Sequence, residues 1–219
     1  HTFEPLKPYF DRVWFWQSVS VGPEGRRAAV GMHDGRTFLF DMDTVEPVHT
    51  FRFGAPIVIS EVPISATATY TLLAPDGVAY FQTGSSSVPQ GGTTHVVTPP
   101  GPHPNANTIN AVGADGKVEW RYRSGHTFQN FWTDYAGRWL MTCAEKQDEE
   151  GVEAGALLFD TRRKGGGTSK LVYYHRVEGR VFFRAAMAPD GGALAFIEVP
   201  YPDPESSALV GKYRLHIVR

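Results

Sequence analysis

Four segments of the chain share one pattern, in which a short apolar strand is followed by a tight turn and a second strand. Proline presets the φ angle at the second turn position and glycine accepts the position with positive φ, so the recurring turn residues have a mechanical cause. A chain that repeats this turn is constrained to fold as a series of antiparallel strands. The segments are 15–32, 68–83, 131–144 and 183–198, and their turn glycines are Gly25, Gly77, Gly137 and Gly191.

A fifth hairpin is predicted inside the segment 108–125, which reads TINAVGADGKVEWRYRSG. Two alternating runs, 109–112 and 118–122, flank the turn that contains Asp115 and Gly116. Asp-Gly between two such runs is among the strongest short-range hairpin signals, because glycine has no Cβ to clash at positive φ. We therefore expect these runs to pair directly.

The repeat has a long period. Successive turn glycines are 52, 60 and 54 residues apart, and further strands follow each hairpin. The repeating unit is thus four antiparallel strands, and the chain holds fifteen predicted strands because the last unit has only three. A period of this length built from four short strands is typical of a β-propeller blade. A β-sandwich is the alternative, but it would not require an internal repeat. Helical periodicity is almost absent.

We predict one propeller-type domain over residues 13–219, either a propeller of about four blades or half of a larger one. A last blade with three strands would leave an unpaired edge, which soluble proteins avoid. The N-terminal segment 1–12, a larger propeller or a second chain could cover that edge. The predicted blades are 13–54, 55–125, 126–179 and 180–219.

Two stretches carry a resemblance to known repeats. The Ala-Pro-Asp-Gly turn at 74–77, followed by a strand of Val, Ala and Phe, resembles the WD-like repeats of bacterial propellers. The stretch 109–122 is similar to the outer hairpin of quinoprotein-type repeats, in which a tryptophan docks on the neighbouring blade, and Trp120 matches that position. The Gly-His and Trp-Asp pairs of true WD repeats are missing. The resemblance therefore implies a propeller fold and no specific function.

Composition excludes several classes of function. The net charge is −2 over 219 residues and no basic run is present, so we expect no nucleic-acid binding. The cluster 162–164 (Arg-Arg-Lys) is interpreted as a solvated turn. The single cysteine, Cys143, excludes an intrachain disulfide and is predicted to be a small core residue. No apolar run is long enough for a membrane span. These features leave the compartment open, with an extracytoplasmic location favoured over a cytoplasmic one.

The connections between strands differ at the two ends of the predicted blades. Turns between first and second strands are short, whereas the loops 84–107, 145–155 and 199–212, between second and third strands, are long. Long loops tolerate variation at the surface and collect binding residues. We expect these loops to crowd one rim and to form a surface for a protein partner. Its candidate residues are His95, His103, Glu149, Glu150, Tyr201, Asp203 and Glu205.

The sequence offers little support for catalysis. It lacks a Gly-x-Ser-x-Gly elbow, a His-Glu-x-x-His metal motif and a phosphate-binding glycine loop. His95 and His103 would need a third ligand to hold a metal, so we predict no metal and no cofactor. The prediction is a non-catalytic module that binds protein partners, as an oligomer or as a subunit of a larger complex. The alternative, implied by the resemblance, is part of a quinoprotein-like periplasmic dehydrogenase or of a related propeller enzyme.

Overall fold

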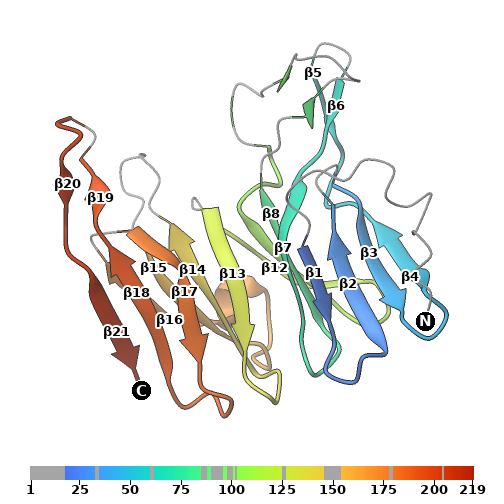
Figure 1. Cartoon of the computed structure of the whole chain (residues 1–219). Helices are drawn as coiled ribbons and strands as arrows, with labels where there is room; N and C mark the ends of the chain where they lie inside the picture. Colours follow the sequence, from blue (N-terminus) through green and yellow to red (C-terminus); the bar gives the residue numbers. More distant parts are fainter. Residues whose placement is uncertain are drawn as a thin grey trace, which may run out of the picture.

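The computed structural model is almost entirely β-sheet (Figure 1). It contains one helix among the described residues, the single turn α1 (Gly167–Lys170), which is too short to cross a bilayer. The described residues are 18–32, 35–59, 62–84, 88–89, 96–97, 101, 103–124, 127–145, 154–177, 180–203 and 205–219. The predicted closing segment, 1–12, lies outside them.

Four antiparallel sheets hold fifteen of the described strands, and we call them the first to fourth blades. Each blade is a meander in which every strand pairs with the next blade strand along the chain. The first blade consists of β1 (Ser18–Val21), β2 (Arg27–Gly31), β3 (Thr37–Asp41) and β4 (Glu46–Phe51). The second consists of β7 (Thr67–Leu73), β8 (Ala79–Gly84), β11 (Thr108–Val112) and β12 (Val118–Arg123).

The third blade has four strands and the fourth has three, as the sequence predicts. The third blade consists of β13 (Thr127–Thr133), β14 (Trp139–Glu145), β15 (Ala154–Asp160) and β16 (Leu171–Val177). In the fourth blade, β18 lies between the other two strands. Its strands are β17 (Arg180–Met187), β18 (Leu194–Val199) and β21 (Arg214–Val218).

The glycine turns lie together at one end of the blades, the lower end in Figure 1. In each of them the glycine has positive φ, and its N–H donates to the carbonyl three residues earlier. The hairpin between β11 and β12 uses the same bond, with Gly116 at φ 78°. The chain therefore reverses its direction with the same turn geometry at five glycines, Gly25, Gly77, Gly116, Gly137 and Gly191.

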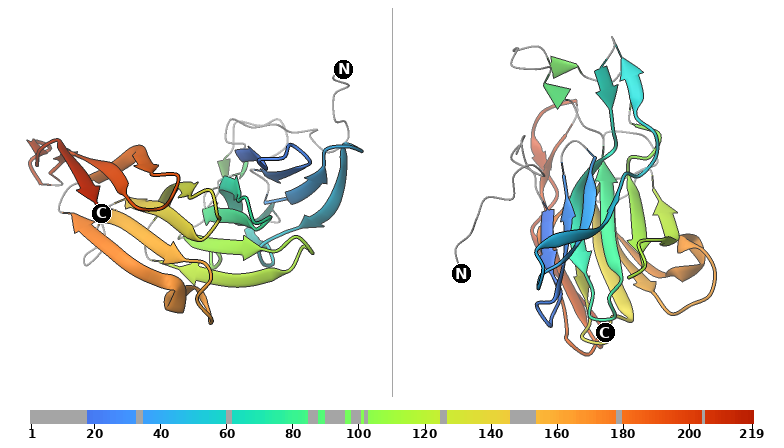
Figure 2. Two further views of the ribbon diagram at one scale, coloured as in Figure 1. Left: turned by 90° about the horizontal axis from the view of Figure 1, so that it is seen from below. Right: turned by 90° about the vertical axis from the view of Figure 1, so that its right-hand side faces the viewer.

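The blades follow one another along an open arc (Figure 2). Strand β7 packs against β1 and β2, β13 packs against β7, and β17 packs against β13 and β14, so within the described residues substantial packing joins consecutive blades only. Close approach of the first two blades depends on Gly31, where a Cβ would lie 2.6 Å from the Ala68 Cβ. Sheets that pack in series around an arc are the arrangement of a β-propeller. The prediction of the fold class is confirmed, and the sandwich alternative is wrong.

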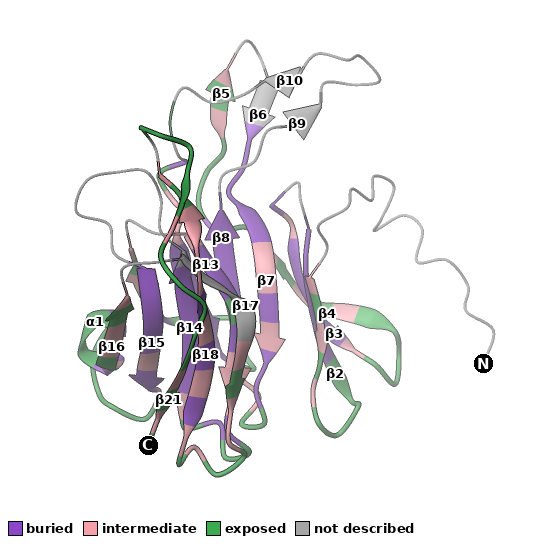
Figure 3. Cartoon of the chain, turned by 60° about the vertical axis from the view of Figure 1, so that its left-hand side comes forward, coloured by how far each residue is buried: buried purple, intermediate pink, exposed green. Residues whose placement is uncertain are grey.

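Apolar side chains fill the spaces between blades. Figure 3 shows how the buried residues are distributed along the blade strands. Trp120 of the second blade is 5% exposed and stacks on Phe159 of the third blade at 5.8 Å between ring centroids. The tryptophan thus docks on the neighbouring blade, as the resemblance implies. Cys143 is fully buried in the core between the third and fourth blades, and burial raises the pKa of its thiol to about 12.

Candidate functional site

Three additional hairpins lie outside the blades, in the connections of the upper end (Figure 1). The link between the first two blades carries one of them, and the connections between second and third strands of the second and fourth blades carry the other two. The sequence pattern predicted loops at 84–107 and 199–212 and missed the pairing within them; it made no prediction for the link that carries β5/β6. The hairpins are β5/β6 (Ile57–Ile59 and Val62–Ile64), β9/β10 (Val88–Pro89 and Val96–Val97) and β19/β20 (Tyr201–Pro202 and Leu209–Val210). We call this surface the upper rim.

Two of the rim hairpins expose apolar side chains. Val58 of β5 is 67% exposed and Leu209 of β20 is 75% exposed. Neither belongs to a core cluster, so their apolar character contributes nothing to the packing between the blades. Exposed apolar residues on structured projections are a common feature of surfaces that bind other proteins.

The hairpin β19/β20 is held by one carboxylate. Asp203 Oδ1 accepts hydrogen bonds from the backbone N–H of Ser206 (2.8 Å) and of Glu205 (2.9 Å), and from the Ser206 hydroxyl (3.0 Å). These donors, led by the Ser206 N–H, lower the pKa of Asp203. Of the predicted rim residues, Asp203 therefore shapes the turn. Tyr201 is half-buried and Glu205 is exposed in the same hairpin.

His103 has a different position from the one expected for a rim residue. It is 1% exposed, its Nδ1 accepts the N–H of Asn105 at 3.0 Å, and its carbonyl accepts the N–H of Ala106 at 2.8 Å. Burial lowers the pKa of this imidazole, which favours the neutral ring. The residue anchors the base of the long loop where it enters β11, and the structure does not bring it together with Tyr201, Asp203 or Glu205. Its side chain is not presented to a partner.

The remaining candidates, His95, Glu149 and Glu150, lie outside the described residues. Across the part of the chain that is described, no group of three or more His, Cys, Asp or Glu side chains is arranged to hold a metal ion.

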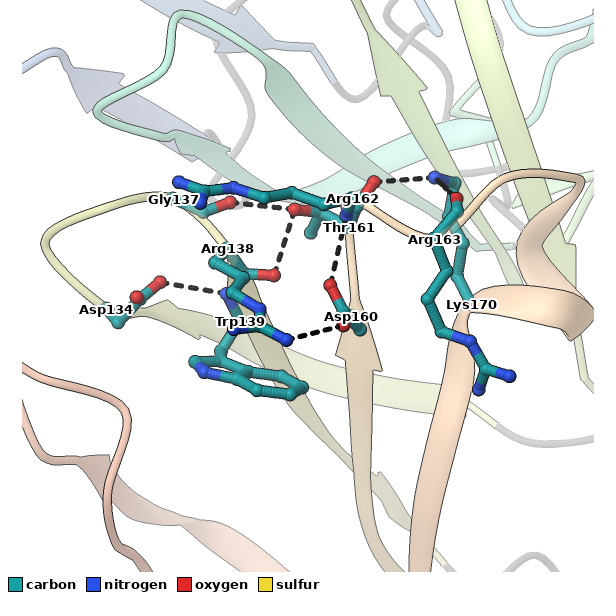
Figure 4. Close-up of polar contacts among 9 residues, drawn as sticks. All are labelled: Asp134, Gly137, Arg138, Trp139, Asp160, Thr161, Arg162, Arg163 and Lys170. Atoms are coloured by element: carbon teal, nitrogen blue, oxygen red, sulfur yellow. Dashed lines mark hydrogen bonds and ion pairs between the residues drawn. The ribbon is translucent and has the colours of Figure 1, made fainter.

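The lower end contrasts with this surface, because its polar groups bond to one another (Figure 4). Asp160 accepts the Arg138 guanidinium at 3.1 Å and the backbone N–H of Arg162 at 3.1 Å. Burial alone would raise the pKa of Asp160, but these donors outweigh it and the pKa is lowered. The Lys170 ammonium donates to the carbonyls of Thr161 (2.5 Å) and Arg163 (2.6 Å). The basic segment 162–164 is an exposed turn, as interpreted from the sequence.

Sequence reasoning missed a polar cluster between the third and fourth blades. Glu198 of β18 is 1% exposed and bonds to Arg214 Nη1 (3.2 Å) and to His216 Nε2 (2.8 Å), both on β21. The His216 ring lies 4.9 Å from that of His175 on β16, whose Nδ1 contacts the Tyr173 hydroxyl at 2.8 Å. The cluster ties the outermost strand of the fourth blade to the third blade. No local motif could have shown it, because its members come from three separate strands.

Comparisons with known proteins add little to this description. No protein-family model matches the sequence, and no curated protein is significantly similar to it. Among solved structures, the chain is similar to BamB from Moraxella catarrhalis, with a TM-score of 0.48 and 12% sequence identity. The alignment covers 81% of this chain and 42% of BamB, so the chain spans less than half of that protein.

Proposed function

We propose that the protein is a non-catalytic propeller-type module that binds another protein through the upper rim. The observation that carries the proposal is the pair of hairpins β5/β6 and β19/β20, which project from the same end and expose Val58 and Leu209. Each hairpin forms a separate two-stranded sheet outside the blades, and its exposed apolar side chain belongs to no core cluster. Burial of those side chains against a partner would remove apolar surface from water and so favour binding.

The chemistry of the rim favours a protein over a polyanion. The exposed basic side chains of the segment 162–164 lie at the lower end, away from the rim hairpins. The described tip of β19/β20 carries the acidic residues Asp203 and Glu205 instead. Apolar side chains beside carboxylates would suit a partner whose surface combines an apolar patch with Lys or Arg at its edge.

Site-specific photo-cross-linking in the source organism tests the proposal. A benzophenone amino acid replaces Val58 in one variant and Leu209 in another. We expect both positions to form an adduct with the same polypeptide, identified by mass spectrometry, because both hairpins face the same partner. Met42, which is 38% exposed in the lower turn between β3 and β4, is the matched control and should give no such adduct.

A second variant separates binding from folding. Replacement of residues 201–210 by a two-residue turn should remove the adduct at position 58 or weaken it strongly, while the unfolding midpoint stays close to that of the wild type. Adducts of equal yield from positions 42, 58 and 209, or none from 58 and 209, would contradict the proposal.

A further inference from the structure

The outer strand of the fourth blade, β21, is held on one side only among the described residues. It pairs with β18 over Arg214–Val218, and no described strand lies along its other edge. Val218 packs in the core between the third and fourth blades, so by strand alternation Leu215 and Ile217 point away from that core. They are 65% and 60% exposed. The attachment of β21 therefore depends on its ladder with β18 and on its inward-pointing side chains.

The inward-pointing side chains of β21 meet a buried carboxylate. Glu198 of β18 is 1% exposed, accepts Arg214 Nη1 at 3.2 Å and lies 2.8 Å from His216 Nε2. The His216 ring stacks on Phe196, with 4.8 Å between ring centroids and an interplanar angle of 7°. On its other side is His175 of β16, in the third blade, at 4.9 Å between ring centroids. Two imidazole rings from adjacent blades thus lie beside one buried carboxylate.

The other described neighbours of His175 do not add a second carboxylate. On its own strand, the Tyr173 hydroxyl lies 2.8 Å from its Nδ1, and Arg176 is exposed on the opposite side of β16. On β15, Ala156 is the residue paired with His175. Behind Ala156, the Cys143 thiol stays protonated, because burial raises its pKa to about 12. The described side chains of β17 carry no charge.

A proton on His175 would leave this cluster with an excess of positive charge. When both imidazoles are protonated, three cations, His175, His216 and Arg214, lie around one carboxylate. Like charges at this distance repel more strongly where burial excludes water. Burial first, and then the charge of His216, accordingly lower the pKa of His175 below its ordinary 6.5, which favours the neutral ring at neutral pH.

We propose that this cluster is an acid-sensitive latch: protonation of His175 separates the two imidazole rings and releases β21 from β18. The release reaches the upper rim, because Glu198 and Arg214 pair directly and the hairpin β19/β20 occupies the chain between them (Figure 1). When β21 opens, that hairpin keeps only its connection to β18. Binding of a partner at Leu209 should then weaken at the same pH; this consequence rests on the proposed function, whereas the latch does not.

Hydrogen exchange of the protein alone tests the latch. Each exchange rate is divided by the intrinsic rate at the same pH, so that protection of the backbone amides can be compared between about pH 7.5 and about pH 5. Below pH 6.5, protection of the β21 amides should fall by up to about tenfold per pH unit, because opening takes up one proton. Amides of β12, an outer strand without histidine, are the internal control and should lose much less protection.

Two variants assign the effect to one side chain. His175→Phe keeps an aromatic ring of similar size beside Phe196 but cannot take up a proton, so the fall in β21 protection with pH should be largely lost. His49→Phe is the matched control, because His49 is a half-buried histidine on β4 of the first blade, and this variant should keep the fall. Circular dichroism should confirm that both variants are folded, and the comparison of β21 with β12 in the wild type needs no variant.

Equal losses of protection in β21 and β12 of the wild type overturn the proposal. So does a fall in β21 protection that is as steep in His175→Phe as in the wild type. The rim partner is absent from this experiment, so its outcome is independent of the photo-cross-links that test the proposed function.

Discussion

The two ends of the blades solve the same problem, strand reversal, in different ways. At the lower end, five turns repeat one hydrogen bond and one glycine conformation. At the upper end, the connections range from the short turn after β2 to the hairpins β5/β6 and β19/β20, and they expose Val58 and Leu209. The lower end therefore uses one local turn geometry in every blade, whereas the connections of the upper end differ from blade to blade.

We also compare how particular buried polar groups are hydrogen-bonded at the two ends. At the lower end, buried Asp134 and Asp160 accept specific donors and Lys170 donates to two carbonyls. Near the upper end, both amide atoms of the fully buried Gln82 and the hydroxyl of Thr37 have no hydrogen-bond partner among the described residues. Buried polar atoms without partners cost free energy, so these are positions where an apolar side chain of similar shape should not destabilise the protein.

The largest difference is expected from one substitution made at both ends. Gly191, at the lower end, has φ 75°, and a Cβ there would lie 2.2 Å from Trp139 Cδ1. Gly211 follows the upper hairpin with φ 93°, and its nearest neighbour would be 3.6 Å away. Gly191→Ala should lower the free energy of unfolding by about 2–4 kcal/mol, from backbone strain plus overpacking. Gly211→Ala should lower it by only the backbone component, about 1–2 kcal/mol.

Urea denaturation followed by tryptophan fluorescence measures both variants. Equal losses of unfolding free energy in Gly191→Ala and Gly211→Ala would contradict the expected difference between the two ends. Trp139→Ala combined with Gly191→Ala provides the control, because removal of the indole should abolish the overpacking component and leave only the backbone component.

The lower end was predictable from the sequence because its chemistry is local. The residues that set each turn, such as Asp115 and Gly116, lie within four positions of one another, and Trp120 was found through its place in one hairpin. The buried state of His103 was not predictable, since the residue bonds to the backbone of Ala55, which is far from it in the sequence. The cluster of Glu198, Arg214 and His216 depends on strand register, which the sequence alone does not fix.

The second prediction tests a lower-end side chain. Asp134 is 4% exposed and its Oδ1 accepts the backbone N–H of Trp139 at 2.8 Å. Asp134→Ala should lower the free energy of unfolding by about 1–3 kcal/mol, because that N–H loses its acceptor in a buried place. Asp43, an exposed lower-turn residue, is the control, and Asp43→Ala should change stability by less than about 0.5 kcal/mol. Equal effects of the two substitutions would mean that the turn network adds no stability.

The third prediction is a substitution at the upper end that increases the free energy of unfolding. Gln82→Met should raise the free energy of unfolding by about 1 kcal/mol, because an apolar side chain of similar length replaces an amide without partners. The neighbouring Thr83 is bonded, its hydroxyl donating to the carbonyls of Thr108 and Asn105. Thr83→Val should therefore lower the free energy of unfolding by about 1 kcal/mol. Denaturation of the two variants side by side measures whether hydrogen bonding decides the sign, and a loss of stability in Gln82→Met would contradict it.

The smallest predicted effect separates, by pH, the polar cluster between the third and fourth blades from the turns of the lower end. Burial first, and then the charge of His216, lower the pKa of His175 below 6.5, against the opposing effect of Glu198, while Tyr173 bonds to its Nδ1. The unfolded chain therefore binds a proton at a higher pH than the folded one. Stability from this residue is fully present above pH 6.5 and is lost as the pH falls through the folded pKa.

At the lower end the carboxyl groups have the opposite signature. The pKa of Asp41 is lowered by the N–H groups of Thr44 and Asp43, and that of Asp115 by Lys117, so stability from these groups is lost only at acidic pH, below their ordinary value of 3.8. In His175→Phe, the unfolding free energy should fall less steeply with pH just below pH 6.5, because the group that takes up a proton on unfolding is gone. The acid limb should stay unchanged. His103 keeps some slope in both proteins because its own pKa is lowered by burial. Identical curves of unfolding free energy against pH for the wild type and His175→Phe would contradict a contribution of His175 to the pH dependence of stability.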